Sequence, residues 1–389
     1  MAVHSSERFN EDVEGSFIHA CLSAYLFHDP SLITPYPNLD WDKFYQLLIQ
    51  GKLVGLFSIL GRTYPDLWPR AVKEKLREDR YRQIPYNDWC LRQAETVLTT
   101  LGDLSIPVIV LKGWALIPLV YDGDPSQRPA SDFDLLVNPQ DVSRITDILH
   151  DLNYADGEME PWPGYFRRYI NSAHYLSSQT FPNSDQFFNI DLHWGFPDAP
   201  YYDRRISVQT LFERAQPFKI AGIDVKYMAT EDYLIYASVH LAHHGYQDTL
   251  SRYYEIAALI LKTKTTINWE IILTNARTWR VIIPLRRMIS KIEILWPKII
   301  PANIHEVIEK LKPSWGERMV DWCLTHSTRK DAIIIILSCL NTPGLIWRLR
   351  FILETAFPGP MYLKHYFGPA PGNLWPLLYL RRFNRFLHG

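Results

Sequence analysis

Asp132-Phe-Asp-Leu-Leu-Val137 is the stretch of sequence that decides the fold. Its apolar residues suit a buried strand, and residues two apart on a strand lie on one face of the sheet. Asp132 and Asp134 are therefore predicted to project together, while Phe133 and Leu135 face the core. Two carboxylates this close repel one another unless cations lie between them. Because Mg²⁺ prefers oxygen ligands, the pattern predicts a magnesium site.

Two further apolar segments are predicted to be strands of the same core. Residues 106–111 form a short run rich in β-branched side chains, which suits a buried strand. Residues 187–193 form another such run, and it contains Asp191. An acid among apolar residues is costly to bury unless it is paired or binds a metal. Asp191 is therefore the predicted third carboxylate of the magnesium site.

The remaining chain shows helical spacing of apolar residues, before the predicted strands and again from Thr230 onward. The shorter predicted elements are helices over 71–82, 88–101, 114–121 and 141–152, and a hairpin that pairs 218–220 with 225–227. The predicted fold class is α/β (α+β), with a small mixed β-sheet core flanked by helical regions. The predicted domains are an N-terminal helical region (1–100), the core (101–228) and a C-terminal helical domain (229–389).

These motifs resemble the polymerase-beta-type nucleotidyltransferase superfamily, whose signature is an apolar residue and Gly, then Asp-x-Asp, then a distant third Asp. More narrowly, the chain resembles a family of uncharacterised bacterial nucleotidyltransferases that carry a Leu-Lys-Gly motif. Trp114 departs from the superfamily, which usually has Gly or Ser after its motif Gly. The matching elements are Ile106–Gly113, Arg128, Ser131–Val137, Asp191–Trp194 and His240–Gly245.

The resemblance implies a role for each residue of the site. Asp132 and Asp134 would bind both metal ions, and Asp191 would bind the catalytic ion and help to deprotonate the acceptor. Gly113 would let the backbone approach the triphosphate, because it has no Cβ atom. Lys112 and Arg128 would neutralise phosphate charge. The complete set of predicted nucleotide contacts is Lys112, Gly113, Arg128, Ser131 and His243.

The reaction that such a site implies is transfer of a nucleoside monophosphate from an NTP, such as ATP, to an acceptor with release of pyrophosphate. It would use two Mg²⁺ ions, with Mn²⁺ as an alternative. The predicted acceptor is a peptide, a sugar or a small molecule. Two alternatives stay open: a non-catalytic nucleotide- or peptide-binding protein that retains the fold, and an RNA-directed nucleotidyltransferase. A kinase is a weaker alternative, because the sequence has neither a Walker A nor a His-Arg-Asp motif.

The composition of the chain limits which partners and which cellular compartment we expect for the protein. The net charge of −1 gives no global basic field, so nucleic acid would need a local patch. Four scattered cysteines without CxxC spacing argue against a zinc site and a disulfide framework. The first fifteen residues lack an apolar segment typical of signal peptides, and the apolar run 332–340 is too short to span a bilayer. We therefore expect a cytoplasmic protein without a membrane span.

Several of these features also have structural interpretations. The two acids of Asp-x-Asp could be solvated, Asp191 could be a paired structural acid, and Lys112 could be an exposed lysine. The histidines of residues 240–244 suit packing better than metal binding, because no acid completes an H-E-x-x-H motif. The C-terminal cations suit either an amphipathic helix surface or a site for an acidic partner or nucleic acid. They accompany aromatic residues and comprise Arg348, Arg350, Lys364, Arg381, Arg382 and Arg385.

Overall fold

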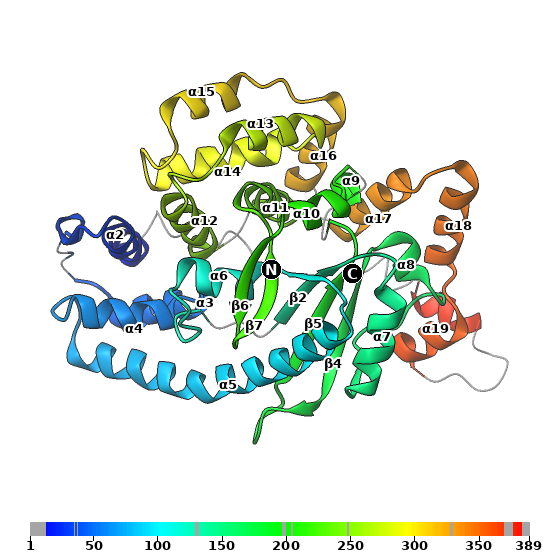
Figure 1. Cartoon of the computed structure of the whole chain (residues 1–389), viewed down its shortest axis with the longest axis horizontal. Coiled ribbons are helices and arrows are strands. Elements are labelled where there is room, and N and C mark those ends of the chain that lie inside the picture. The colour runs from blue at the N-terminus through cyan, green and yellow to red at the C-terminus, as the bar shows by residue number, and fades with distance from the viewer. Residues whose placement is uncertain are drawn as a thin grey trace.

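Helices enclose one mixed sheet in the computed structural model of the chain (Figure 1). The strands are β1 (Val108–Val110), β2 (Asp132–Val137), β3 (Tyr154–Asp156), β4 (Ser172–Thr180), β5 (Phe187–His193), β6 (Gln216–Ile220) and β7 (Ile223–Tyr227). In the part of the chain that the structure describes, they form one seven-stranded sheet in the order β3-β4-β5-β2-β1-β7-β6. The described residues are 13–34, 36, 38–128, 132–196, 200–203, 205–246, 249–326, 330–368 and 376–382.

The middle of the sheet contains the three strands that the sequence predicts for the core. β2 pairs with β5 in parallel and with β1 in the antiparallel direction, and β1 pairs with β7 in parallel. The predicted hairpin is confirmed as β6 and β7, which are antiparallel. β3 and β4 extend the sheet beyond β5 and are not predicted from the sequence. The outer part of β4 is polar and exposed, so it lacks the apolar alternation that marks a strand.

Helices form the larger part of the structure and lie on both sides of the sheet. The N-terminal helices are α2 (Val13–Phe27), α3 (Trp41–Gln50), α4 (Val54–Thr63) and α5 (Arg70–Asp103), with a 3₁₀ turn at Pro30–Leu32. Helices between the strands are α6 (Lys112–Val120), α7 (Val142–Asp151), α8 (Tyr165–Tyr169), α9 (Pro200–Asp203) and α10 (Val208–Arg214). The C-terminal helices are α11 (Thr230–His243), α12 (Leu250–Lys262), α13 (Trp269–Thr278), α14 (Ile282–Leu295), α15 (Ala302–Lys310), α16 (Trp315–His326), α17 (Lys330–Asn341), α18 (Leu345–Ala356) and α19 (Pro360–Phe367).

The helix α5 is longer than the sequence predicts. The predicted helices 71–82 and 88–101 are joined into one helix of 34 residues, with Pro85 in its interior. Proline lacks an amide hydrogen and usually breaks or kinks a helix. Here the residues that follow it, Tyr86 and Trp89, are buried against the sheet. The prediction of two separate helices was therefore wrong, because packing of the second half continues the helix through the proline.

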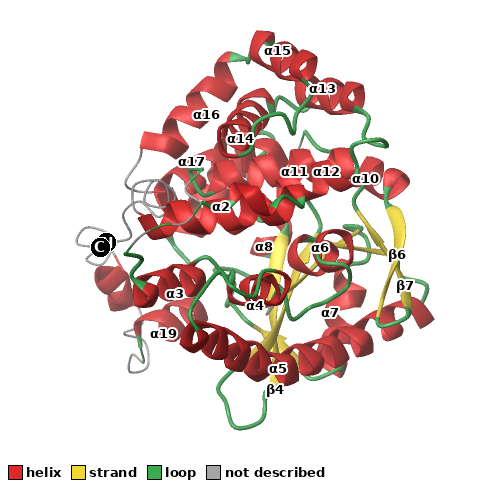
Figure 2. Ribbon diagram, turned by 90° about the vertical axis from the view of Figure 1, so that its left-hand side faces the viewer, coloured by secondary structure: helices red, strands yellow, loops and turns green. Residues whose placement is uncertain are grey.

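Alternation along β2 separates the two large hydrophobic clusters of the described residues. Phe133 and Leu135 belong to a cluster that contains buried residues of α5 and α7, whereas Leu136 belongs to a cluster with α11 and α12. Figures 1 and 2 both show the sheet between α5 on one side and the C-terminal helices on the other. One face of β2 thus lies in an apolar core, and the other meets the C-terminal helices.

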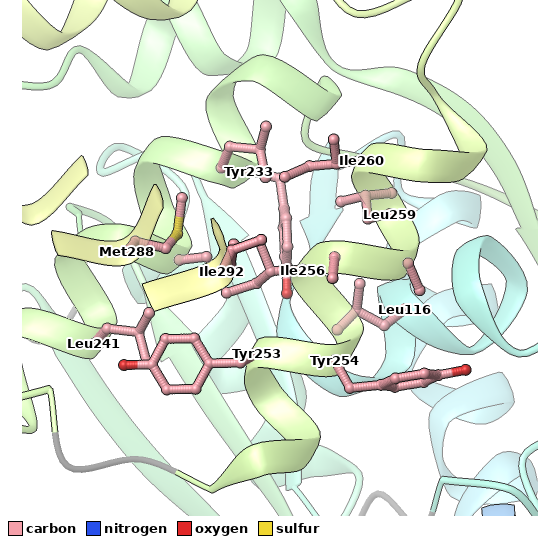
Figure 3. Packing of buried hydrophobic residues seen from close by; sticks show 14 of the residues in the cluster. Leu116, Tyr233, Leu241, Tyr253, Tyr254, Ile256, Leu259, Ile260, Met288 and Ile292 are labelled. Carbon is pink, nitrogen blue, oxygen red and sulfur yellow. The ribbon is translucent and has the colours of Figure 1, made fainter. Parts of the chain in front are cut away.

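The larger cluster joins helices from distant parts of the sequence. It contains Phe17 of α2, Leu116 of α6 and Ile256 of α12 together with Met288 of α14. Figure 3 shows aromatic and aliphatic side chains of α11, α12 and α14 gathered in this cluster, with Leu116 of α6 beside α12. This one cluster contains residues from all three predicted domains. The boundaries between those domains stay a prediction. Among the described helices, none combines the length and hydropathy needed to cross a bilayer.

Candidate active site

The parallel pairing of β2 with β5 places two of the predicted acids side by side. Asp134 is opposite Asp191 in this register, so both side chains lie on the same face of the sheet. His193 is two residues further along β5 and shares this face. One ligand atom from each of these three side chains can be chosen so that all lie within 4.8 Å of one another. The structure therefore brings together two acids that are far apart in the sequence.

Asp134 is buried, and cationic or polar groups compensate its charge. Its side chain is 2% exposed, with Nζ of Lys112 2.7 Å from Oδ1 and Nε2 of His193 3.1 Å from the same oxygen. Burial alone would raise the pKa of Asp134, but the charge of Lys112 and the hydrogen bond from His193 lower it below its ordinary value. Asp134 is consequently held as a carboxylate inside the protein.

The Leu-Lys-Gly motif explains how Lys112 reaches this carboxylate. The amide of Leu111 donates to the backbone oxygen of Asp134 at 2.9 Å, which extends the pairing of β1 with β2. Lys112 then starts α6 with a left-handed backbone angle, φ 47°. A residue with a Cβ atom rarely adopts this conformation, and such strain is concentrated at functional sites. The turn from strand to helix thus points the ammonium group to the acid.

Asp191 has a partner that the sequence does not reveal. β4 pairs with β5 so that His174 lies opposite Asp191, and its Nδ1 donates to Oδ1 of Asp191 at 2.5 Å. This hydrogen bond raises the pKa of His174, although burial opposes the shift. His174 could have been identified only from the two-residue alternation of β4. The polar side chains of this strand hide that alternation in the sequence. His174, Asp191 and Asp134 form one row across three strands.

Asp132 begins β2 and is exposed, two residues before Asp134 and on the same face. Its neighbour across the sheet is Asn189 of β5, and it is not part of the group formed by Asp134, Asp191 and His193. Metal binding by Asp132 therefore stays a prediction. Ser131, a predicted nucleotide contact, lies outside the described residues.

The space above Gly113 is occupied by the guanidinium group of Arg128. A Cβ atom added at Gly113 would lie 2.2 Å from Nη1 of Arg128, so any larger residue would displace that side chain. Nε of Arg128 donates to Oε1 of Glu255 at 2.6 Å, and the hydroxyl of Tyr121 donates to the same oxygen at 3.0 Å. The absence of a Cβ atom at Gly113 thus makes room for Arg128, and its approach to a triphosphate stays a prediction.

A small pocket next to Lys112 collects several cations and aromatic side chains. Arg252 of α12 joins Lys112 and Arg128 there, and its position three residues before Glu255 places both on one helix face. The sequence prediction did not include Arg252. His240 lines this pocket, whereas His243, the predicted contact, is not among the described lining residues. The remaining lining residues are Leu116, Tyr233, Tyr236, Ala237 and Glu255.

The donor set of the site fits a divalent cation. Two carboxylates and an imidazole offer ligand atoms that lie within 4.8 Å of one another. Carboxylate oxygens suit Mg²⁺ and Mn²⁺, and an imidazole nitrogen is tolerated better by Mn²⁺. Anionic phosphate would be attracted to the neighbouring cations Lys112, Arg128 and Arg252.

Comparison with known families agrees with this geometry. Residues 37–296 match the model of a family described as uncharacterised nucleotidyltransferase. The chain belongs to this family. The predicted family is therefore confirmed, and it implies an enzyme of the nucleotidyltransferase type with an NTP as substrate. No curated protein matches the chain.

The region matched by the family contains the whole of the candidate site. It covers β1, β2 and β5 as well as α11 and α12, and it extends to the end of α14. Trp114, which departs from the superfamily motif, is a core residue: it is 3% exposed, and its ring lies 5.5 Å from that of Phe133. The bulky side chain therefore points away from the acids, to the opposite face of the sheet.

Proposed function

We propose that the protein transfers a nucleoside monophosphate from an NTP to a peptide, sugar or small-molecule acceptor in a magnesium-dependent reaction. The observation that carries this proposal is the pairing of Asp134 with Asp191 beside a cationic pocket. An oxygen of the acceptor forms a bond to the α-phosphorus, and the bond from this phosphorus to the bridging oxygen of the β-phosphate breaks. The acceptor loses its proton, and pyrophosphate leaves.

In this proposal the acids hold the metal and receive the proton. Asp132, Asp134 and Asp191 would hold two Mg²⁺ ions, or Mn²⁺ in their place, and Asp191 would accept the proton of the acceptor. Bound ions would neutralise charge on the phosphates and make the acceptor hydroxyl more acidic. His174 keeps the Asp191 carboxylate in one orientation through its hydrogen bond. The reaction therefore depends on positioning and charge compensation, as in other phosphoryl transfers.

The cations next to the acids bind the triphosphate in this proposal. Lys112 lies 2.7 Å from Asp134, and Arg128 lies 2.6 Å from Glu255. Both are thus fixed in place before a nucleotide arrives, which lowers the entropy lost on binding. Arg252 lines the same pocket and adds a third cation. Ser131 and His243 complete the proposed contacts with the nucleotide.

The reaction can be tested with each common NTP labelled at the α-phosphate, in the presence of Mg²⁺ and a cell extract that supplies acceptors. We expect the label on an acceptor and release of one pyrophosphate for each transferred group. A parallel reaction uses NTP labelled at the γ-phosphate, and transfer of the γ-label without transfer of the α-label would contradict the proposal in favour of a kinase. Magnesium-dependent binding of NTP without pyrophosphate release would identify the non-catalytic alternative.

A further inference from the structure

The outward surface of α18 carries aliphatic side chains that face solvent. They follow the spacing i, i+1, i+4, i+7 and i+8, which places them on one side of a helix. Ile346 is 80% exposed, and even the least exposed member of the set is 48% exposed. Figure 1 shows α18 at the rim of the molecule, away from the sheet. We name this set the outer face of α18: Leu345, Ile346, Leu349, Ile352 and Leu353.

The opposite side of α18 fixes this orientation. Phe351 is 1% exposed, and its ring lies 6.0 Å from that of Tyr165 and 4.9 Å from that of Tyr169. Nη2 of Arg168 donates to Glu354 at 2.9 Å, which links α8 to the same side of α18. Rotating the helix to bury its aliphatic residues would break these contacts. The outer face is therefore held toward solvent by the packing of the rest of the helix.

The C-terminal segment that contains this apolar face is rich in cations. Residues 327–389 contain eight Lys and Arg against two Asp and Glu, a net charge of +6, whereas the whole chain has a net charge of −1. One of the two acids, Glu354, is already paired with Arg168 and Arg350. Lys364, on the next helix, is exposed. The C-terminal segment thus combines exposed aliphatic residues with a strong excess of cations.

An anionic lipid surface is complementary to both properties. Amphipathic helices with cations beside their apolar side bind at the boundary between headgroups and acyl chains. Arg350, four residues after Ile346 on the same helix, flanks the outer face of α18, and its guanidinium group lies 5.3 Å from the ring of Trp347. Both residue types favour the headgroup region. A second copy is a poorer partner, because a symmetric contact would bring two positively charged surfaces together. We propose that the outer face of α18 docks on the surface of a bilayer that carries anionic phospholipids.

This docking is independent of the proposed reaction. The match to the nucleotidyltransferase family ends at residue 296, whereas α18 begins at Leu345. The docking surface therefore lies outside the matched region. Docking on a bilayer is a property separate from the reaction proposed for that region. Failure of nucleotide transfer would leave the docking proposal intact, and failure of docking would leave the reaction intact.

Co-sedimentation of the full chain with vesicles tests the proposal. The probe is phosphatidylcholine vesicles with or without phosphatidylglycerol, at low and high salt. We expect binding to the anionic vesicles, which weakens as salt is raised, and much weaker binding to phosphatidylcholine alone. Ile346→Glu removes an apolar contact and adds a negative charge, so the affinity for anionic vesicles should fall about tenfold or more.

Ile294→Glu is the matched control, because Ile294 is 69% exposed on α14, outside the outer face of α18. It should leave vesicle binding unchanged, and Leu349→Ser serves as a second variant of the outer face. Circular dichroism checks that each variant is folded. Equal binding by Ile346→Glu, Ile294→Glu and the parent would overturn the proposal. So would a parent dimer that Ile346→Glu converts to a monomer without any vesicle binding, since the outer face would then pair two copies.

Discussion

At the centre of the sheet a carboxylate is buried, and at the rim of the molecule isoleucine side chains are exposed. Asp134 is 2% exposed beside Lys112 and His193, whereas Ile346 on α18 is 80% exposed. Both regions reverse the usual partition of charged and apolar groups. The buried carboxylate is tolerated because the charge of Lys112 and a hydrogen bond with His193 compensate it. The exposed apolar face is tolerated because its own helix packs through the other side. We propose that each of these regions binds a ligand. The buried carboxylate binds a cation and a nucleotide, and the exposed apolar face binds a lipid surface.

The prediction with the largest expected effect concerns the activity of a variant of the buried carboxylate. We expect Asp134→Asn to lower nucleotide transfer by about a thousandfold or more, because a metal ligand contributes several kcal/mol to transition-state stabilisation. The measurement is transfer of label from an α-labelled NTP, with circular dichroism as the check on folding. Asp151→Asn is the control, since Asp151 is an exposed acid at the end of α7. Full activity of Asp134→Asn would show that the buried charge serves the fold alone.

A second test separates buried ion pairs from exposed ones. Glu255→Gln removes the carboxylate charge beside the largely buried guanidinium group of Arg128, so the free energy of unfolding should fall by about 3 kcal/mol. Urea denaturation measures this change. The control is Glu74→Gln, which breaks the exposed pair with Arg70 and should leave the midpoint unchanged. Equal midpoints for both variants would mean that the Arg128 pair is accessible to water.

A third test concerns Asp232, an acid buried among the C-terminal helices and away from the proposed metal ligands. Burial raises the pKa of Asp232 to about 6, although Arg214 at 3.0 Å opposes the shift. Between pH of about 4 and 6 the folded protein therefore keeps a proton that the unfolded chain releases, so stability contributed by this group falls as the pH rises. The total change is about 3 kcal/mol.

Urea denaturation across this pH range, compared with Asp232→Asn, isolates the contribution of Asp232. The variant should lose the fall in stability that the parent shows, whereas Asp224→Asn, at an 84% exposed acid, should follow the parent. Parallel curves for the parent and Asp232→Asn would contradict the raised pKa. Asp232 is thus a buried acid that is paired with an arginine. The experiment compares it with the buried acid that lies among the side chains of the proposed metal site.

The smallest expected effect is at the rim. Ile346→Ala should change the free energy of unfolding by less than about 0.5 kcal/mol, because its side chain already faces solvent. Ile289→Ala, at a fully buried isoleucine of α14, should cost about 2 kcal/mol or more. Thermal or urea unfolding of the protein measures both. A large loss for Ile346→Ala would show that the outer face of α18 is covered in solution and would remove the contrast between the two regions.

The sequence identified the central strands and the acids on them from local patterns. The two-residue period of a strand is sufficient to place Asp132 and Asp134 on one face and Phe133 in the core. Apolar runs identified β1, β2 and β5, and turn residues identified the hairpin of β6 and β7. Local patterns missed β4 because its outer half is polar, and they predicted a break near Pro85 because they contain no information on what the helix packs against.

The contacts of the site required the tertiary structure. Register between β2 and β5 decides that Asp134 lies opposite Asp191, and a shift by one residue would turn one side chain to the other face. His174 reaches Asp191 only through the pairing of β4, and Glu255 meets Arg128 across 127 residues of sequence. The sequence by itself thus determined which residues could carry charge on one face of a strand. The tertiary structure decided which charges meet, because pairing between distant segments depends on packing and register rather than on local periodicity.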